Sequence, residues 1–328
     1  MLANVPYKCR RIGDAALMHM LVDGICMCCL YLLLRASAVA DIIGTFLTYN
    51  ILAFVSQPLT GLCADFMRQR HWMLIASVAF MSVGVLFTSL SMSGYMPVVG
   101  AWLVAVILGV GNSLFHVWGG KQTVIVAGND MRAIGVFVST GAFGLSLGYV
   151  FCSWPLVYAF LLAFCLLSMD YFFVDGRCAG TDVDSRGDKD RKWRLGVLAA
   201  SAAMVAIMVV VMMRSYVGEV FSGGIQKNNT IVLAVGATAM IGKMAGGWLA
   251  KSVGVVAALT TLVVAVGVCW MMRDNGNAVL WVGLFLVNLT MPVTLYLANA
   301  VMRGWEGLAF GLLAAVLLPG FILAGGLL

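Results

Sequence analysis

The sequence predicts an all-helical protein that crosses a membrane many times, and two observations carry this prediction. Of the 328 residues, 62% are hydrophobic and only 10% are charged, whereas a soluble domain is about half apolar and a quarter charged. Apolar runs of about 20 residues, long enough to cross a hydrocarbon layer of about 30 Å, also recur along the whole chain. Since lipid offers backbone groups no hydrogen-bond partner, runs this long and uniform are expected to be unbroken helices.

Eleven such runs can be drawn. They cover residues 15–34, 42–64, 72–91, 96–118, 133–152, 155–174, 195–220, 230–250, 254–272, 277–301 and 306–328. The first run follows Lys8, Arg10 and Arg11 without a separate cleavable signal, so it is expected to remain as the first span.

The basic residues predict the orientation. With a cytoplasmic N-terminus, 15 of the 20 Lys and Arg residues fall inside and 4 fall outside, while Lys243 lies within a span. This excess predicts a multi-pass protein of the inner or plasma membrane with its N-terminus in the cytoplasm. Residues 175–194 alternate acids and bases among Gly and Ser, so they are expected to form a flexible cytoplasmic linker. The linker divides the chain into a six-helix bundle, 1–174, and a five-helix bundle, 195–328.

Short matches between the two halves indicate an internal repeat. Gly61 and Gly247 each lie near the end of a run, in "QPLTGLCADFMR" and "KMAGGWLAKSVG", at turns with the same predicted topology. Another pair of runs is preceded by a Met-Arg dipeptide, which ends at Arg132 in one half and at Arg303 in the other. Two parallel repeats joined by a long inside loop are typical of transporters.

Residues 61–70, "GLCADFMRQR", resemble the loop signature between helices 2 and 3 of the major facilitator superfamily. Asp65 and Arg70 match its acid and final base, while Phe66 and Arg68 replace a base and a glycine. Four further stretches resemble the fosmidomycin-resistance branch; they are "HMLVDG", "FVSQPLTGLCAD", "GVGNSLFH" and "RSYVG". The resemblance covers nearly the whole chain and implies two helical bundles that work by alternating access.

The resemblance also implies a gate at the cytoplasmic end. The Asp65 carboxylate would cap a helix that starts near Gly307, because backbone donors and the positive dipole end favour an anion there. The other expected gating residues are Arg70, Arg132 and Arg303. With Phe66 and Arg68 off the pattern, a looser contact is expected. The superfamily has twelve spans and this sequence shows eleven, so the twelfth is expected to be missing, and Lys251 stands where the second half would carry an acid.

His19 and Asp23 are ionisable groups inside the first apolar run. They lie at positions i and i+4, hence on one face of a helix. A lone charge at that depth costs about 2.5 to 3.5 kcal/mol on insertion scales, so the pair should face the protein interior or a hydrated cavity. We predict that Asp23, assisted by His19, is the proton-coupling site; the alternative is a neutral hydrogen-bonded pair that ties helices together.

Two basic residues within later runs are candidates for substrate binding. Lys243 and its repeat partner Gln57 are expected to line a central cavity, where the lysine offers a cation to an anionic substrate or a counter-charge to Asp23. The alternative for Lys243 is a side chain that snorkels to the interface. Arg214 lies nearer the outer boundary and could draw anions inward, or could snorkel or pair with Glu219.

Further polar residues within the runs could contact substrate, although hydrogen bonding between helices is the commoner use of such groups. These residues are Asn112, His116, Asn288, Tyr296 and Asn299. The three histidines are too far apart in sequence to give ligand spacing, so no metal site is expected. The cysteines lie mostly in apolar runs and are expected to be small buried hydrophobes.

Together these features predict a secondary active transporter, with proton-coupled antiport that exports a small, anionic compound or drug. The alternatives are uptake or facilitated passage of a metabolite, and a sensor or assembly factor that keeps the fold without transport. No phosphate loop or nucleophile motif is present, so enzymatic activity, ATP drive and a cofactor are not expected. The expected partners are a small-molecule substrate, protons and the lipid bilayer, with no nucleic acid, and the chain is expected to be a monomer.

Overall fold

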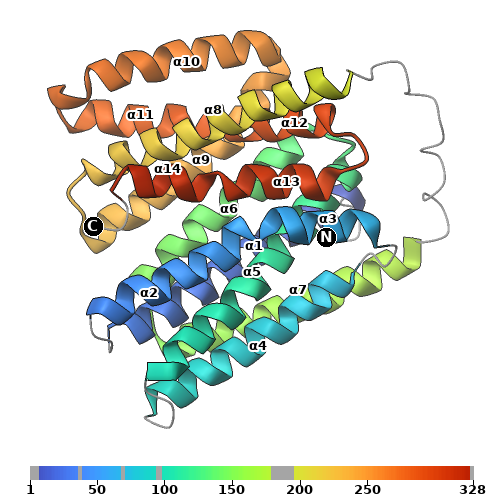
Figure 1. Ribbon diagram of the computed structural model, residues 1–328, viewed down its shortest axis with the longest axis vertical. Helices are drawn as coiled ribbons and strands as arrows, with labels where there is room; N and C mark the ends of the chain where they lie inside the picture. Colours follow the sequence, from blue (N-terminus) through green and yellow to red (C-terminus); the bar gives the residue numbers. More distant parts are fainter. Residues whose placement is uncertain (1–6, 36–38, 68–70, 94–97, 179–195, 326–328) are drawn as a thin grey trace.

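The computed structural model describes residues 7–35, 39–67, 71–93, 98–178 and 196–325, and every long regular element in these ranges is helical (Figure 1). The first half contains α1 (Tyr7–Leu34), α2 (Val39–Asn50), the π-helical turn η2 (Ile51–Val55), α3 (Gln57–Phe66), α4 (Trp72–Met92), α5 (Val98–Ala127), α6 (Met131–Val150) and α7 (Trp154–Cys178). The second half contains α8 (Val197–Gly223), α9 (Asn229–Val253), α10 (Val255–Met271), η4 (Arg273–Asn275), α11 (Asn277–Leu289), α12 (Met291–Val301), α13 (Glu306–Ala315) and α14 (Leu317–Leu323).

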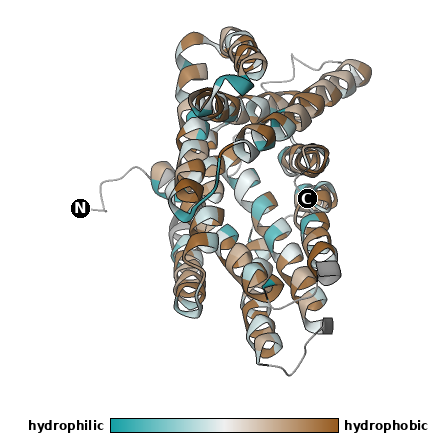
Figure 2. Ribbon diagram, turned by 90° about the vertical axis from the view of Figure 1, so that its left-hand side faces the viewer, coloured by the Kyte–Doolittle hydropathy of each residue, from teal (hydrophilic) through white to brown (hydrophobic). Residues whose placement is uncertain are grey.

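The helices confirm the prediction of a polytopic all-helical membrane protein. Among the described residues, 10 helical segments are long and apolar enough to cross a membrane, and α10 is a shorter apolar helix. Brown, hydrophobic residues cover most of the ribbon in Figure 2. The predicted linker is described only at its start, where α7 continues to Cys178; the rest of it, residues 179–194, lies outside the described residues.

Three runs expected to be unbroken helices are interrupted, and a proline lies at each interruption. The second span changes to the π-helical turn η2 and restarts as α3 with Pro58 in its first turn. Pro292 lies in the first turn of α12, directly after α11 ends, and Pro319 follows the break between α13 and α14. Proline lacks a backbone N–H and its ring clashes with the carbonyl four residues earlier, so the ladder breaks just before it. The expectation of unbroken helices was wrong at these three places.

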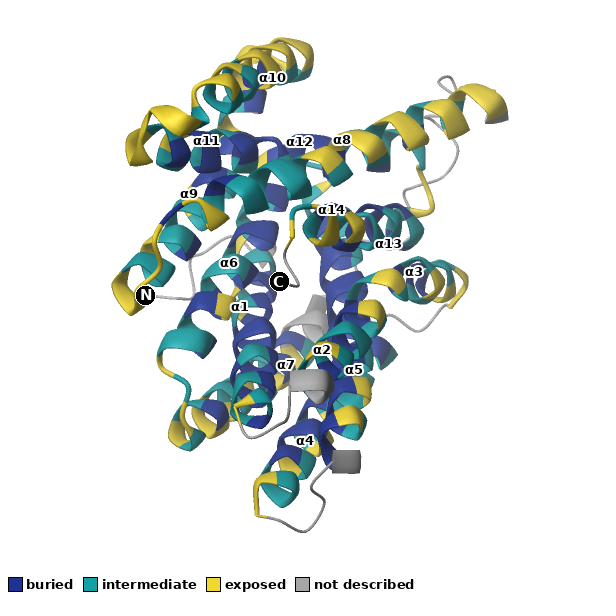
Figure 3. Cartoon of the chain, turned by 60° about the vertical axis from the view of Figure 1, so that its left-hand side comes forward, coloured by how far each residue is buried: buried dark blue, intermediate teal, exposed yellow. Residues whose placement is uncertain are grey.

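Burial is concentrated on α1 and α5. In the most apolar 18-residue window of each helix, 72% of residues are buried in α5 and 67% in α1, against 11% in α8. Figure 3 shows the same contrast, with α5 mostly dark blue and α10 mostly yellow. His19, Asp23, Asn112 and His116 on α1 and α5 therefore lie in the interior of the protein. The exposed apolar side chains of α8 and α10 have the chemistry of a lipid-facing surface.

Two helix pairs join the first half of the chain to the second at very short range. Gly61 on α3 lies against the carbonyl group of Gly307 at the start of α13. Gly247 on α9 lies against the carbonyl group of Met131 at the start of α6. A β-carbon at either glycine would overlap that backbone, so both contacts require the absence of a side chain. The two glycines that match in the sequence repeat thus occupy equivalent positions in the structure.

The equivalence continues one turn along each pair. The carbonyl group of Gln57 faces Gly311 on α13, and the carbonyl group of Lys243 faces Gly135 on α6. Gln57 and Lys243, predicted to be repeat partners, therefore occupy matched places in the α3–α13 and α6–α9 contacts. The repeat predicted from short sequence matches is confirmed at these positions.

We expect Gly61→Leu to lower the thermal stability of the purified protein, because the leucine side chain must displace α13 from α3. Overpacking a tight contact typically costs about 1 to 3 kcal/mol. The matched control is Gly267→Leu on α10, where a β-carbon would meet nothing within 4 Å. Equal melting temperatures for the two variants would contradict the close α3–α13 contact.

Candidate functional site

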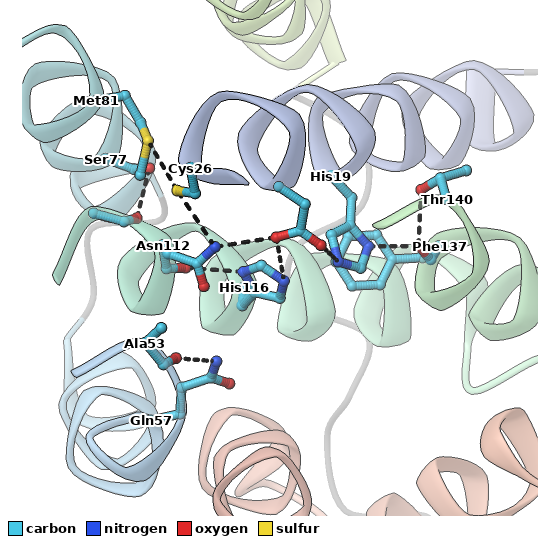
Figure 4. Close-up of polar contacts among 12 residues, drawn as sticks. His19, Cys26, Ala53, Gln57, Ser77, Met81, Asn112, His116, Phe137 and Thr140 are labelled. Atoms are coloured by element: carbon cyan, nitrogen blue, oxygen red, sulfur yellow. Dashed lines mark hydrogen bonds and ion pairs between the residues drawn. The ribbon is translucent and has the colours of Figure 1, made fainter. Parts of the chain in front are cut away.

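The Asp23 carboxylate lies among polar side chains from α1 and α5. His19 Nε2 is 3.4 Å from Asp23 Oδ2, and His116 Nε2 is 3.5 Å from Asp23 Oδ1. Asn112 Nδ2 donates a hydrogen bond of 3.1 Å to the same Oδ1 atom. In Figure 4, His19, Asn112 and His116 lie along this line of contacts between the two helices. We call His19, Asp23 and His116 the imidazole–carboxylate cluster.

The cluster is shielded from the surroundings of the protein. The side chain of Asp23 is 11% exposed, that of His19 is 7% exposed and that of His116 is 8% exposed. Asp23 therefore points into the protein, as predicted, and not toward lipid. The structure adds His116, which the sequence indicated only as a possible substrate contact, to the group of residues that contact Asp23.

Backbone carbonyl groups orient both imidazole rings. His19 Nδ1 is 2.8 Å from the carbonyl oxygen of Phe137, and His116 Nδ1 is 3.0 Å from that of Asn112. A carbonyl oxygen only accepts hydrogen bonds, so each Nδ1 atom carries the proton and donates it. Each ring thereby presents its Nε2 atom to the Asp23 carboxylate. The rings meet edge to face with centroids 4.5 Å apart.

A glycine-rich face of α6 allows α1 to approach closely. Gly141 lies against Asp23 Oδ2 and His19 Nε2, and Gly144 lies against the carbonyl group of Met20. Thr140 Oγ donates a 2.6 Å hydrogen bond to the carbonyl oxygen of Ala16. The partner of this glycine-rich face is therefore α1.

Two buried amides near the cluster have unused acceptors. Asn112 Oδ1 and Gln57 Oε1 are both buried without a hydrogen-bond partner, while Gln57 Nε2 donates to the carbonyl oxygen of Ala53 at 2.6 Å. Figure 4 shows Gln57 across from Asn112 and His116. Unpaired buried acceptors are uncommon in proteins, so this region has free capacity to bind a donor or a cation.

Arg214 and Lys243 face inward from α8 and α9. Arg214 Nη1 donates to Thr294 Oγ on α12 at 3.5 Å, so the contact is not the predicted pair with Glu219. Lys243 is close enough to Asp23 and Arg214 for their charges to interact with its amine. Within the described ranges, however, neither Lys243 nor Arg214 forms an ion pair with a carboxylate.

The three candidates on α11 and α12 are not brought to Asp23 by any hydrogen bond described. Asn288 and Asn299 donate to carbonyl groups four residues earlier in their own helices. The carbonyl oxygen of Tyr296 accepts from Asn129 Nδ2 at 3.3 Å. These contacts fit the alternative of hydrogen bonding within and between helices.

Asp65 makes the helix-capping contact that the resemblance implied. Its Oδ1 accepts from the backbone N–H of Gly307 at 3.0 Å, and its Oδ2 accepts from that of Leu308 at 2.8 Å. The Asp65 side chain is 1% exposed. A carboxylate that accepts two backbone donors at a helix N-terminus is well stabilised, so this contact holds α3 against α13.

The expectation of a looser contact is not supported, because other residues replace the missing parts of the signature. Lys121 on α5 lies with Nζ 2.9 Å from Asp65 Oδ1 and donates to the carbonyl oxygen of Ala64 at 2.7 Å. Phe66 packs edge to face on Trp305, with centroids 5.3 Å apart. Lys121 thus supplies a cation that the signature would place next to Asp65 in sequence. Arg70 and Arg68 lie outside the described residues.

The α6–α9 contact is equivalent to the α3–α13 contact, but its charges are exchanged. The acid, Asp130, caps the helix α6 itself, and the base, Lys251, lies on the facing helix α9. Asp130 caps α6 by accepting from the backbone N–H of Arg132 at 2.9 Å, and the Arg132 side chain donates to the same carboxylate at 2.7 and 3.2 Å. These hydrogen bonds lower the pKa of Asp130 below its usual value, and the charge of Lys251 on α9 adds to the effect. Lys251 thus interacts with an acid supplied by the capped helix itself. Arg303 is exposed beside the start of α13.

Sequence reasoning missed three residues of these contacts: the role of His116 at Asp23, Lys121 and Asp130. His116 and Asn112 lie at positions i and i+4, as His19 and Asp23 do. Two polar pairs with the same spacing, each inside an apolar run, were a signal that the two helices face one another. Lys121 gave no comparable signal, because Asp65 lies 56 residues away in sequence. Asp130 directly precedes α6, and an aspartate just before a helical run is a recognised N-cap signal.

Comparisons with known proteins show the fold. No family model and no curated protein sequence matches the chain. Among solved structures, the fucose:proton symporter FucP of E. coli aligns with a TM-score of 0.65 and 11% identity, over 96% of this chain and 89% of that chain. A structure of FucP, a major facilitator superfamily transporter, in the outward conformation aligns with the same TM-score and identity, over 98% and 91%. The human organic anion transporter MFSD10 aligns with a TM-score of 0.65 and 15% identity, over 98% and 96%. A bacterial homologue of the iron transporter ferroportin, in an outward-facing state, aligns with a TM-score of 0.56 and 12% identity, over 98% and 91%.

The chain therefore has the major facilitator fold, as the sequence predicted. Identities of 11 to 15% support the fold and do not transfer a substrate. The fosmidomycin-resistance branch stays a prediction.

We expect Asp130→Ala to destabilise the protein by about 1 kcal/mol at neutral pH, since a lost N-cap typically costs about 0.5 to 2 kcal/mol. The pKa of Asp130 is lower in the folded than in the unfolded state. The Asp130 carboxylate therefore makes its full contribution to the free energy of unfolding above its unfolded pKa of about 3.9. This contribution is lost as the pH falls through the lower folded pKa. Thermal unfolding in detergent would measure this effect. The difference in stability between wild type and Asp130→Ala should be smaller at acidic than at neutral pH. Asp274→Ala, at a side chain 85% exposed, is the control; a difference that grew on acidification would contradict the prediction.

Proposed function

We propose that the chain is a secondary transporter that moves a small solute by alternating access, with the imidazole–carboxylate cluster as its cation-coupling site. The observation that carries the proposal is a carboxylate held inside a membrane-spanning bundle by two imidazoles and an amide. Ionisable groups are costly inside a membrane and are kept where they bind ions or substrates. The major facilitator fold supplies the two halves between which such a site can change sides.

The Asp65 contact supports a state closed at the end that the charge pattern predicts to be cytoplasmic. It joins α3 and α5 of the first half to α13 of the second through one buried carboxylate. Opening this end requires α3 to leave α13, so the two backbone hydrogen bonds to Asp65 must break. We propose 1–174 and 195–328 as the two bodies that move, with Asp65, Arg70, Arg132 and Arg303 at the gate.

An anionic cargo is supported by Lys243 and Arg214. Both are basic residues on membrane-spanning helices, and within the described part of the chain neither pairs with a carboxylate. An anion between them would supply the missing counter-charge. The organic anion transporter among the similar structures fits this cargo class. The proton as the coupling ion, export as the direction and a drug as the cargo stay predictions from the sequence.

Two other functions predicted from the sequence remain as candidates. A facilitator for uptake would use the same gate without a coupling ion. A sensor would bind solute without moving it.

We expect wild-type protein in proteoliposomes to give charge movement or flux with at least one member of a panel of small organic anions. Asp23→Asn should reduce the response at least tenfold, because the amide keeps the size of the side chain but loses its charge. His71→Gln is a matched control, since His71 packs against Trp118, Tyr171 and Phe172 outside the cluster. Full response from Asp23→Asn would contradict the coupling role, and binding of anions without flux would favour the sensor.

We expect Asp65→Asn to open the predicted cytoplasmic end, because a neutral amide is a weaker partner for Lys121 and for two backbone donors. Spin labels at positions 66 and 305, with Cys9 and Cys63 replaced by serine, would report the separation of α3 and α13. The population at the short distance should fall in Asp65→Asn and stay unchanged in Asp274→Asn. Identical distance distributions in all three proteins would contradict the gating role.

A further inference from the structure

We infer that His19, Asp23 and His116 form a binding site for a divalent transition-metal ion. One ligand atom from each of the three residues lies within 4.8 Å of the other two, and all three side chains are buried. The inference concerns binding alone and does not depend on transport. The spacing of the histidines in the sequence argued against a metal site; the packing of α1 on α5 removes that argument.

The separations of the ligand atoms match a metal site. Bonds of about 2.0 to 2.2 Å at tetrahedral angles put neighbouring nitrogen and oxygen ligands about 3.4 Å apart. The two Nε2–carboxylate distances are 3.4 and 3.5 Å. A direct hydrogen bond from an imidazolium to a carboxylate is shorter, about 2.7 to 2.9 Å. Each imidazole nitrogen thus lies at about the ligand–ligand spacing from one of the two carboxylate oxygens, and beyond the length of a short charged hydrogen bond.

The orientation of the rings fits the same assignment. Each Nδ1 atom donates to a backbone carbonyl oxygen, from Phe137 for one ring and from Asn112 for the other. In a neutral imidazole the Nε2 atom is then an unprotonated acceptor. Two such acceptors and a carboxylate face one another, which is repulsive unless a proton or a metal cation lies between them. Histidines that bind metals commonly donate their second ring N–H to a carbonyl group in this way.

The backbone of α6 packs directly against two of the ligand atoms, and one further acceptor lies beside them. Gly141 places no β-carbon beside Asp23 Oδ2 and His19 Nε2, where one would overlap both atoms. The Oδ1 atom of Asn112 is buried and unpaired, and rotation of the amide would turn it toward the carboxylate. Lys243 forms no ion pair with Asp23 among the described residues, so its amine does not occupy the carboxylate oxygens.

The ligand types indicate the class of ion. Two imidazole nitrogens and one carboxylate oxygen suit Zn²⁺, Fe²⁺, Co²⁺ or Mn²⁺, and open positions can be completed by water or by an amide oxygen. Mg²⁺ and Ca²⁺ prefer oxygen ligands only. The site should therefore discriminate against the two abundant alkaline-earth ions.

The test is a titration of the full-length protein, purified through a tag without histidine and stripped with a chelator, with Co²⁺ alone. We expect one Co²⁺ per chain, with visible absorption bands of a nitrogen-ligated ion, displaced by Zn²⁺ and not by a large excess of Mg²⁺. His116→Gln and Asp23→Asn should each weaken binding at least tenfold, whereas His71→Gln should leave it unchanged. Gly141→Ala keeps all three ligands, but its methyl group would overlap Asp23 Oδ2 and His19 Nε2 and displace them, so it should also weaken binding.

Several results would overturn the inference. These are the absence of stoichiometric Co²⁺ binding to the wild type, equal displacement by Mg²⁺ and Zn²⁺, and a loss of binding in His71→Gln as large as in His116→Gln. The wild-type titration decides the matter even where a variant fails to fold. Metal binding without flux would support the metal site and count against transport. Flux without metal binding would support transport and overturn the metal site.

Discussion

The enclosed charge of Asp23 is the constraint on which the rest of this molecule depends. A carboxylate in a low-dielectric interior is tolerated only with close polar partners, and α1 carries just one of them, His19, on the same face. The others come from α5, which must lie alongside α1 to bring Asn112 and His116 to the carboxylate. The approach of α6 at Gly141 and Gly144 closes the remaining side. This requirement accounts for the burial of α1 and α5, in contrast to the exposed apolar surfaces of α8 and α10.

A second constraint is the approximate repeat between the halves. Gly61 and Gly247 allow α3 and α9 to touch the first turns of α13 and α6, and Gln57 and Lys243 follow one turn later in each contact. The two contacts have the same backbone geometry but different polar chemistry. One half places a neutral amide and the other an amine at matched positions. A pair of duplicated helices can thus keep its packing while one copy acquires a charge, since the glycines determine the packing and the longer side chains do not.

The sequence predicted most of the fold because its signals were physical and strong. Long apolar runs have few alternatives in lipid, and the Asp65 cap followed from a motif whose backbone partner lies at a helix start. The candidate site was predicted only in part. His19 and Asp23 are neighbours on one helix, so their spacing revealed them, whereas His116 reaches Asp23 only through the packing of α1 on α5. Lys121 replaces a base that the motif carries elsewhere, and pattern matching along the chain does not detect such a replacement in space.

The exchanged charges at the α6–α9 contact have a consequence for ionic strength. The Asp65 carboxylate is 1% exposed, whereas Asp130 and Arg132 have side chains 26% and 48% exposed and Lys251 is an exposed residue. Dissolved ions screen exposed charges over about 8 Å in physiological salt and affect buried ones far less. Concentrated electrolyte would therefore weaken the attraction of Lys251 for the α6 cap while leaving the Asp65 cap of α13 intact. The α3–α13 and α6–α9 contacts between the halves would then differ in strength, by an amount that depends on the salt concentration of the compartment that they face.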